Sequence, residues 1–171
     1  MKTHEFTIIA SGLDPEADDF EDRFFEAGCG DATIAFQKGV IVLEFAREAP
    51  NFLKAVTSAI DDVQRAGATV ERVEPDHLVS LSEIARRAGL TRSAISLYAK
   101  GARAEGFPAP VARVMTENPL WDWYEVARWM RSHERRVGLH EVLQARIVRQ
   151  MNLLVVEQRM STGRVGKVLR G

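Results

Sequence analysis

The sequence predicts an α+β protein in three consecutive parts. A module of four strands and two helices is expected at residues 1–76, because strand-like runs alternate there with apolar residues at helical spacing. A second, mainly helical part with a β-hairpin is expected at residues 77–134. It opens at residues 80–101, where two helix starts are separated by a glycine. A long helix with a basic tail is expected at 135–171, where apolar residues repeat every three or four positions.

Composition excludes several classes of protein. The 171 residues are 46% hydrophobic and 27% charged, which is ordinary for a globular domain. No apolar run is long enough to span a membrane, and the first residues lack the features of a signal peptide, so a cytoplasmic location is expected. The single cysteine, Cys29, excludes an internal disulfide framework and a zinc site built from several cysteines.

Charge is distributed unevenly along the chain. Residues 1–76 hold 7 Lys and Arg against 16 Asp and Glu, a net charge of −9. Residues 77–130 have a net charge of +2, and residues 131–171 have +6. Only the second half of the chain is therefore expected to meet a polyanion such as nucleic acid.

The first module is predicted from helix caps and apolar spacing. Asp14 and Pro15 form a helix start, and Gly28 ends that helix. A second helix is predicted at residues 51–66, and strands at 5–13, 31–37, 40–46 and 68–74. The apolar faces of the helices are expected to be buried: Ala17, Phe20, Phe24 and Ala27 in the first, and Leu53, Val56, Ile60 and Val63 in the second.

The resulting order, β-α-β-β-α-β, is that of the ferredoxin-like fold, in which two helices cover one face of a four-stranded antiparallel sheet. Such domains bind small ligands, pair with a copy of themselves or bind RNA. The strong acidity of the module and the lack of an aromatic RNA-binding motif on its strands argue against RNA. Dimerisation, ligand binding and partner binding stay open, because a fold alone does not choose among them.

No catalytic or metal-binding pattern is found. The acidic helix after Pro15 is interpreted as a solvated face with its carboxylates near the favourable N-terminal end, rather than as a metal site. Cys29 is interpreted as a small turn residue rather than a reactive thiol. The histidines, His4, His77, His133 and His140, have no metal-ligand spacing. We therefore expect no enzyme activity, no metal and no cofactor.

Residues 80–101 meet the requirements of a helix-turn-helix. Ser80 and Glu83 form an S-x-x-E capping box for the first helix. Gly89 is expected to take the positive φ of the turn, and Thr91 to cap the second helix. The buried side is expected to consist of Ile84, Ala85, Ala88, Leu90, Ile95 and Tyr98. An ordinary pair of packed helices is the alternative.

The second of these helices, residues 92–100, is expected to read DNA. The N-terminal end of a recognition helix enters the major groove, so Arg92, Ser93 and Ser96 are the candidate base contacts. Arginine pairs with two guanine acceptors, whereas serine pairs with several bases. Leu97 also faces outward. The candidate contacts to the DNA backbone are Ser82, Thr91, Lys100 and Arg103.

A short β-hairpin and a third helix follow. The hairpin strands are predicted at residues 111–115 and 120–121, around a turn at 116–119. Asp122 and Glu125 form a second capping box for the helix. The apolar face of that helix is expected to contain Val126, Trp129 and Met130. Trp121, Trp123 and Trp129 are expected in the core rather than stacked on bases.

The order of helix-turn-helix, hairpin wing and helix resembles the winged helix-turn-helix of the MerR and excisionase-like (AlpA-like) superfamily. This resemblance implies a wing along the DNA backbone or the adjacent minor groove, with Arg113 as its contact. Residues 39–129 also resemble an uncharacterised bacterial family of small helix-turn-helix proteins. The shared features are an FxREAP-like segment at 45–50, an EPDxLVS junction at 74–80, TRSAI, and an FPAPV…WxWxEV block. That second resemblance implies DNA binding and no more.

The C-terminal part predicts one long amphipathic helix over residues 137–160. Its apolar positions are Leu139, Val142, Leu143, Ile147, Met151, Leu154 and Val155. This helix either packs on its own domain or pairs with a partner, including a second copy. The Gly-rich basic end that follows is expected to displace counterions from DNA phosphates.

Together these features predict a sequence-specific double-stranded DNA-binding transcriptional regulator, cytoplasmic and associated with the nucleoid. One helix-turn-helix contacts few base pairs, so a homodimer that reads two half-sites about one helical turn apart is expected. One alternative is an adaptor of antitoxin-like or mobile-element origin, whose acidic N-terminal module binds a protein partner and whose DNA domain autoregulates. The other is a regulator that senses a small molecule.

Overall fold

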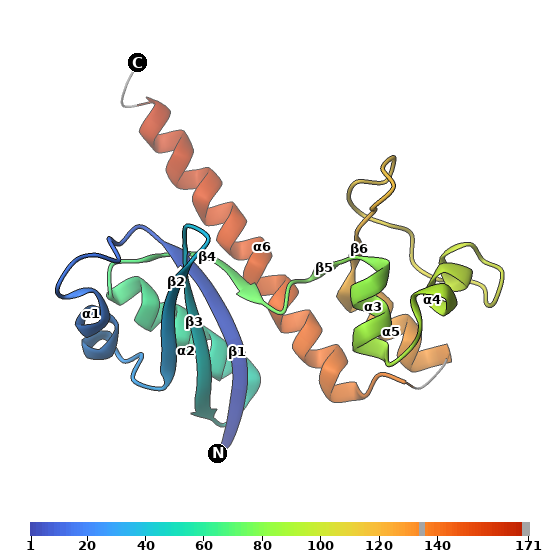
Figure 1. Ribbon diagram of the computed structural model, residues 1–171, viewed down its shortest axis with the longest axis horizontal. Helices are drawn as coiled ribbons and strands as arrows, with labels where there is room; N and C mark the ends of the chain where they lie inside the picture. The colour runs from blue at the N-terminus through green and yellow to red at the C-terminus, as the bar shows by residue number, and fades with distance from the viewer. Residues whose placement is uncertain (134–135, 169–171) are drawn as a thin grey trace. The chain divides into compact units, whose positions relative to one another are not determined.

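The computed structural model describes residues 1–133 and 136–168, with side chains up to residue 162. The chain is α+β and separates into two compact units (Figure 1). Met1–Pro75 and the part of helix α6 from Gln150 form the first unit, and Asp76–Arg149 forms the second. The C-terminal helix, expected in a segment of its own, is thus divided between the two units.

A four-stranded antiparallel sheet forms the centre of the first unit. Its strands are β1 (Lys2–Ser11), β2 (Ala32–Gln37), β3 (Val40–Ala49) and β4 (Thr69–Glu74), in the order β2-β3-β1-β4. The longest pairing joins β1 to β3, from Lys2 opposite Ala49 to Ala10 opposite Ile41. All four strands were predicted, but β3 continues beyond residue 46, because its alternation of buried and exposed residues extends to Ala49.

Two helices complete the fold of this unit. Helix α2 (Phe52–Arg65) packs on one face of the sheet, and α1 (Phe20–Ala27) contacts α2 (Figure 1). The predicted end of α1 is confirmed, since Gly28 ends it with a φ of 109°, and α2 is capped by Asn51, whose Oδ1 accepts from Lys54 N at 2.9 Å. The largest fully buried side chains of the unit are Ile8, Phe24, Ile41, Leu43, Val56, Val63 and Val73.

Two expectations for these helices are wrong. Helix α1 begins at Phe20 rather than at Pro15, and Ala17 is exposed. The Asp14 carboxylate accepts from the backbone N–H of Glu16 at 2.9 Å, which favours a turn over a helix at this point. In α2, Leu53 is 45% exposed and Ile60 only half-buried. The buried face lies elsewhere on the helix, at Phe52, Ala55, Val56, Ala59 and Val63.

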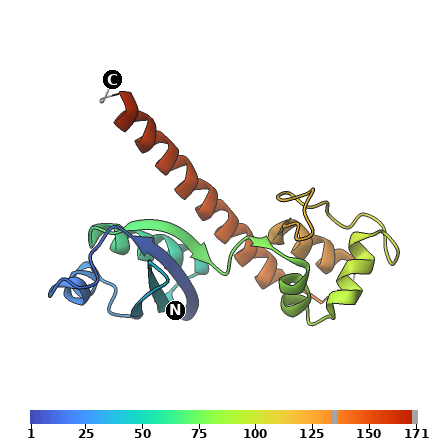
Figure 2. The same ribbon diagram turned by 45° about the horizontal axis from the view of Figure 1, so that its top comes forward.

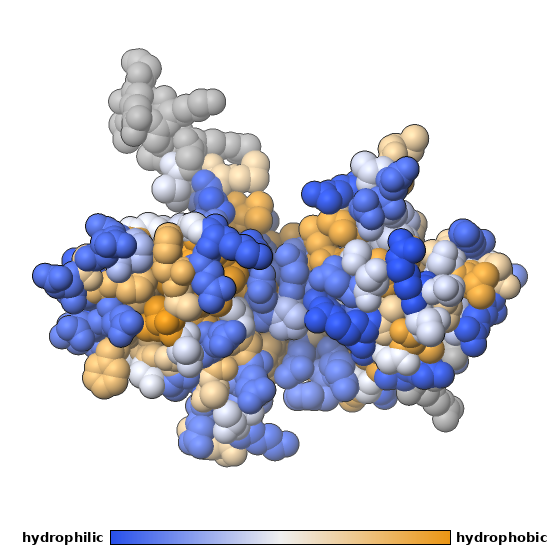
Figure 3. All heavy atoms as spheres, viewed as in Figure 1, coloured by the Kyte–Doolittle hydropathy of each residue, from blue (hydrophilic) through white to orange (hydrophobic). Residues whose placement is uncertain are grey.

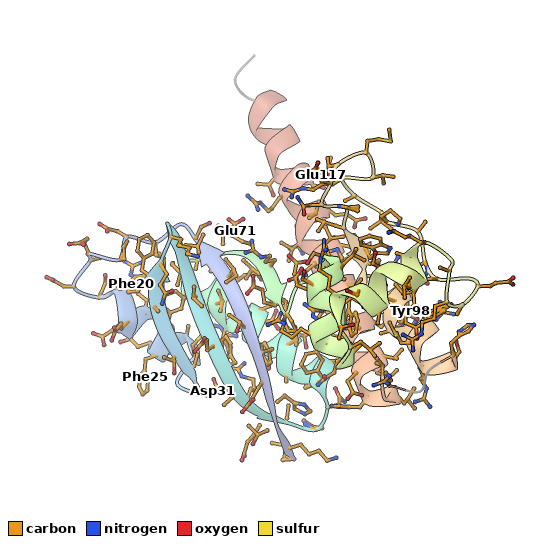
Figure 4. All side chains as sticks on the ribbon, turned by 45° about the vertical axis from the view of Figure 1, so that its right-hand side comes forward. Phe20, Phe25, Asp31, Glu71, Tyr98 and Glu117 are labelled. Atoms are coloured by element: carbon orange, nitrogen blue, oxygen red, sulfur yellow. The ribbon has the colours of Figure 1, made fainter. Side chains whose placement is uncertain are left out.

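A buried arginine ties the elements of the first unit together. Arg47 of β3 is only 7% exposed and donates to both carboxylate oxygens of Asp31, at 2.8 and 2.9 Å. It also donates to Asp62 at 2.8 Å, to Ser58 Oγ at 3.1 Å and to the Gly28 carbonyl at 2.9 Å. The hydrogen bonds that Arg47 donates lower the pKa of Asp31, which is labelled in Figure 4. The same hydrogen bonds raise the pKa of Arg47. The guanidinium therefore links β3 to the end of α1, the start of β2 and the middle of α2.

The part of α6 from Gln150 covers an edge of the sheet. Asn152 is 4% exposed and pairs with both backbone groups of Val73 on the edge strand β4. The Val73 N–H donates to Asn152 Oδ1 at 2.7 Å, and Asn152 Nδ2 donates to the Val73 carbonyl at 3.0 Å. Arg159 forms an ion pair with Glu71 of the same strand. The asparagine amide therefore substitutes for a further strand and covers part of an edge that could otherwise pair with another chain.

The second unit combines helices with a two-stranded sheet. The helices are α3 (Leu81–Ala88), α4 (Arg92–Ala99), α5 (Trp123–His133) and the first part of α6. Strands β5 (Leu78–Val79) and β6 (Trp121–Asp122) pair antiparallel. A single core joins these elements; its most buried residues include Val79, Ile84, Ile95, Tyr98, Val126 and Met130. The Asp122 carboxylate caps α5 by accepting from Tyr124 N at 2.9 Å and Glu125 N at 3.4 Å.

The predicted hairpin of the second unit is wrong in its details. Ala112 and Leu120 form a single bridge, in which the Leu120 N–H donates to the Ala112 carbonyl at 2.9 Å. Residues 113–119 form a loop of turns and bends rather than a strand and a short turn. Arg113 has a φ of 52°, which is incompatible with an extended strand. Trp121, expected to continue the return strand, pairs instead with Val79.

Helix α6 (Leu139–Val168) is continuous in both ribbon views (Figures 1 and 2). Its buried residues are Val142, Ala145, Val148, Asn152 and Val155. The expected buried face is therefore wrong in part, because Leu139, Leu143 and Leu154 are 53%, 47% and 49% exposed. Figure 3 shows hydrophilic residues across the visible face of each unit, with hydrophobic ones interspersed. Within residues 1–133 and 136–168, no helix is long and apolar enough to cross a membrane.

Candidate nucleic-acid interface

Helices α3 and α4 are held by the caps that the sequence predicts. The Glu83 N–H donates to Ser80 Oγ at 3.3 Å, and the Ser80 N–H donates to Glu83 Oε2 at 2.8 Å, so the capping box is complete. Gly89 makes the turn with a φ of 64°, as expected. Thr91 Oγ1 accepts from the Ala94 N–H at 3.1 Å and starts α4. These local contacts fix where each helix begins and the point at which the chain turns.

One side of α4 is buried against aromatic rings. Ile95 and Tyr98 are at most 1% exposed, as predicted, and Tyr98 is labelled in Figure 4. The Tyr98 ring lies 6.1 Å from the Phe107 ring, nearly parallel to it, and 5.2 Å from the Trp129 ring, edge to face. Trp129 Nε1 in turn donates to the Glu105 carbonyl at 3.2 Å. This packing orients α4 and leaves only its other side available for a ligand.

The outer face of α4 consists of Arg92, Ser93, Ser96, Leu97 and Lys100, which together line a shallow depression of about 370 Å³. All three candidate base contacts therefore lie on one surface, together with Lys100. Arg92, Ser93 and Lys100 are exposed, and Ser96 is half-buried. Lys100 is the C-cap of α4, which ends at Ala99 rather than at residue 100.

The loop at residues 112–120 lies close to the N-terminal ends of both helices. A small hollow of about 90 Å³ is lined by Ser80, Leu81, Ser82, Arg92, Glu117, Asn118 and Pro119. It brings Ser82, a candidate backbone contact, near Arg92. Glu117, labelled in Figure 4, and Asn118 were expected only as turn residues. No pattern in the sequence points to their place in this hollow, because it depends on tertiary packing.

Two further candidates lie outside both hollows. Arg103 is exposed, and its guanidinium lies 5.2 Å from the centre of the Tyr98 ring. Arg113 is exposed in the loop, where its carbonyl accepts from Thr116 N at 3.0 Å and from Thr116 Oγ1 at 2.8 Å. Thr116 therefore orders the backbone at Arg113 and leaves the guanidinium in solvent.

Among the described residues no carboxylate pairs with three cations of this surface, although Glu117 lines the same hollow as Arg92. Arg92, Lys100 and Arg113 form no ion pair within the part of the chain that the structure describes. Arg149 of the same unit, in contrast, pairs with Asp122 at 2.8 Å. The three unpaired cations are therefore available to an external anion.

The tryptophans belong to the core, as expected. Trp121, Trp123 and Trp129 are 4%, 8% and 7% exposed. Trp121 Nε1 donates to the Pro108 carbonyl at 3.0 Å, and the Trp129 indole is also bonded. Their rings are therefore not available for stacking on nucleic-acid bases.

Three other features bear on chemistry: the thiol of Cys29, the arrangement of potential metal ligands and a depression beside α5. Cys29 is buried, and burial together with the nearby Asp62 carboxylate raises the pKa of its thiol to about 11. The thiol is therefore protonated at neutral pH and is a poor nucleophile. Among the described residues, no three His, Cys, Asp or Glu side chains are grouped as a metal ion would need. A depression of about 960 Å³ lies beside α5 and includes Glu125, Arg128, Trp129 and Ser132. It is open, and the hydroxyl of Ser132 in its lining lies 2.8 Å from His133 Nδ1.

No family model, no curated protein and no solved structure matches this chain.

Proposed function

We propose that this protein is a sequence-specific double-stranded DNA-binding transcriptional regulator. In this proposal α3 and α4 form a helix-turn-helix, the loop at residues 112–120 is its wing, and α4 enters the major groove by its N-terminal end. The observation that supports this most is the division of α4 into two sides. Ile95 and Tyr98 fix one side in the core, and the other presents unpaired polar and cationic groups.

The base contacts are assigned to Arg92, Ser93 and Ser96. Arg92 is the first residue of α4, the end that reaches deepest into the groove in this geometry. Its guanidinium matches the O6 and N7 acceptors of guanine, and such a bidentate pair discriminates against other bases by about 1–3 kcal/mol. The serine hydroxyls both donate and accept, so they specify more weakly.

The backbone contacts are assigned to Ser82, Thr91, Lys100, Arg103 and Arg113, which are all exposed. Lys100 and Arg113 supply charge without a competing ion pair among the described residues. The Thr91 oxygen accepts the capping hydrogen bond from Ala94, so its hydroxyl hydrogen is free to donate to a phosphate. These contacts set the position of α4 and carry no sequence information themselves.

Useful specificity requires two copies, so we propose a homodimer. A β-α-β-β-α-β order with the strand order β2-β3-β1-β4 agrees with a ferredoxin-like module, and such modules can pair. The exposed Leu139 and Leu143 of α6, in the second unit, offer further apolar surface for a second copy. The net charge of −9 on residues 1–76 makes the first module a poor contributor to DNA binding.

A protein-binding adaptor is the second candidate function. The face of the sheet opposite α2 carries Glu5, Glu44 and Glu48, which alternate with core residues such as Phe6 and Leu43 and are exposed. An acidic sheet face of this kind suits a basic protein partner. Purification from the native host discriminates between the two functions, because recovery of only DNA and further copies of this chain removes the adaptor.

Selection of bound sequences from a random duplex pool tests the proposal. The wild type should enrich one motif that contains guanine, and Arg92→Ala should lose the preference at that base pair. Arg131→Ala is the matched control, because Arg131 is exposed on α5 and lines neither hollow around α4. Identical motifs and affinities for the wild type and Arg92→Ala would show that α4 does not read DNA.

A further inference from the structure

Leu97 occupies an unusual place on the outer face of α4. It lies between polar residues, with Ser93 one turn before it, Ser96 next to it and Lys100 one turn after it. Its side chain is 46% exposed, whereas its neighbours on the other side of the helix, Ile95 and Tyr98, are 0% and 1% exposed. About half of the Leu97 side chain is therefore open to a ligand, among the polar and cationic residues that line the same depression.

The major groove of DNA contains one apolar group that fits such a side chain. Thymine exposes a C5-methyl group at its edge, whereas guanine, adenine and cytosine expose acceptors and donors. A leucine placed against those polar groups would remove water from them without replacing their hydrogen bonds, which costs free energy. Leucine against thymine instead buries two apolar surfaces. The same residue therefore favours one base and disfavours the other three.

We infer that Leu97 packs against the methyl group of a thymine and is a specificity-determining residue of α4. This inference rests on the proposed DNA-binding function and names a base that the polar residues of α4 do not specify. Leu97 follows Arg92 by five residues, about 7.5 Å along a helix at 1.5 Å per residue.

The size of the effect follows from the burial of one methyl group. Burial of a CH₂-sized group contributes about 0.8 kcal/mol, which corresponds to a roughly fourfold change in affinity. A dimer with two half-sites doubles that free energy, and the effect becomes about fifteenfold. These ratios are large enough to measure by titration.

The experiment compares duplexes that differ only in the methyl group. Duplexes selected from the random pool are made once with thymine and once with uracil, which lacks the C5-methyl group. Affinities are measured by fluorescence anisotropy for the wild type and for Leu97→Ala. The wild type should bind the uracil duplex about fourfold more weakly per half-site, and Leu97→Ala should bind both duplexes alike. Leu53→Ala is the matched control, because Leu53 is 45% exposed on α2 and should keep the wild-type ratio.

The possible outcomes separate this inference from the proposed function. If the wild type binds a selected motif but Leu97→Ala shows the same thymine-to-uracil ratio as the wild type, DNA binding stands and the inference about Leu97 is wrong. If no motif is enriched from the pool, the proposed function fails and the inference fails with it. Circular dichroism of Leu97→Ala should match that of the wild type, which shows that a changed ratio does not come from unfolding.

Discussion

Arg47→Met should destabilise the first unit by about 3 kcal/mol. Methionine keeps an apolar stem but removes five hydrogen bonds of 2.8 to 3.1 Å, three of them to the carboxylates of Asp31 and Asp62. Loss of one partner of a buried ion pair costs about 3–5 kcal/mol, because it leaves the other charge uncompensated. The lower value applies because the Asp31 side chain is 32% exposed and Asp62 keeps its ion pair with Arg65 at 2.8 Å.

Urea denaturation measures this loss with an internal reference. Far-UV circular dichroism follows the whole chain, whereas all three tryptophans lie in Asp76–Arg149 and report the second unit. With an m-value of about 1.5 kcal/mol per M, the unfolding midpoint of the first unit should fall by about 2 M. Arg23→Met is the control, because Arg23 forms an exposed ion pair with Asp19 that should contribute at most about 1 kcal/mol.

The effect should also depend on pH. Arg47 lowers the pKa of Asp31 in the folded state below its ordinary value of 3.8. The stabilisation is therefore fully present above that value and is lost as the pH falls through the lowered pKa. The difference in the free energy of unfolding between the wild type and Arg47→Met should shrink below about pH 4. A loss under about 1 kcal/mol at pH 7, or a loss unchanged at pH 3, would refute this account of the Arg47 cluster.

Three further predictions concern single residues. Lys100→Ala should weaken binding to all duplexes alike and should reduce the slope of log K against log salt by about 0.9 for each copy of the chain. An unchanged slope would show that Lys100 does not contact a phosphate. Gly89→Ala should lower the free energy of unfolding of the second unit by about 1 kcal/mol, as measured by tryptophan fluorescence. The cost comes from the φ of 64°, since no atom lies within 4 Å of the added Cβ. Cys29, with a pKa of about 11, should react with a thiol reagent at pH 8 only after urea unfolds the protein, and fast reaction of the folded protein would contradict its burial.

The features that the sequence predicts best are those set by neighbouring residues. The capping box of Ser80 and Glu83, the turn at Gly89 and the cap at Thr91 each involve residues within four positions of each other. Their hydrogen bonds form as soon as the helix does, whatever packs on it. The four strands of the first sheet are predicted for a similar reason, since strand-like runs of residues are local; in β3, for example, buried and exposed residues alternate.

The features that the sequence does not predict depend on contacts between distant residues. Nothing in the sequence distinguishes Arg47 from other charged residues, because its partners Asp31 and Asp62 come near it only in the folded chain. Trp121 continues a predicted hairpin, but its actual strand partner is Val79, far back in the chain. The leucines expected to face the core from α6 are half-exposed, because the packed side of this helix uses valines, an alanine and an asparagine.

The candidate site is intermediate between these cases. Its residues on α4 share one face because of helical spacing, and spacing can be read from sequence. The hollow that joins Ser82 and Arg92 to Asn118 of the loop could not be foreseen, because it depends on how the loop folds back. Whether this surface reads DNA stays a prediction.

The ratio of affinities for a selected duplex and for a shuffled duplex of the same composition tests the central claim most directly. Both affinities are measured with the full chain at physiological salt, because the electrostatic part of binding depends strongly on ionic strength. A sequence-specific regulator should prefer the selected duplex by about 10³-fold or more, and Arg92→Ala should reduce that preference. Equal affinity for the two duplexes, or no measurable affinity for either, would contradict the assignment of α4 as a DNA-reading helix.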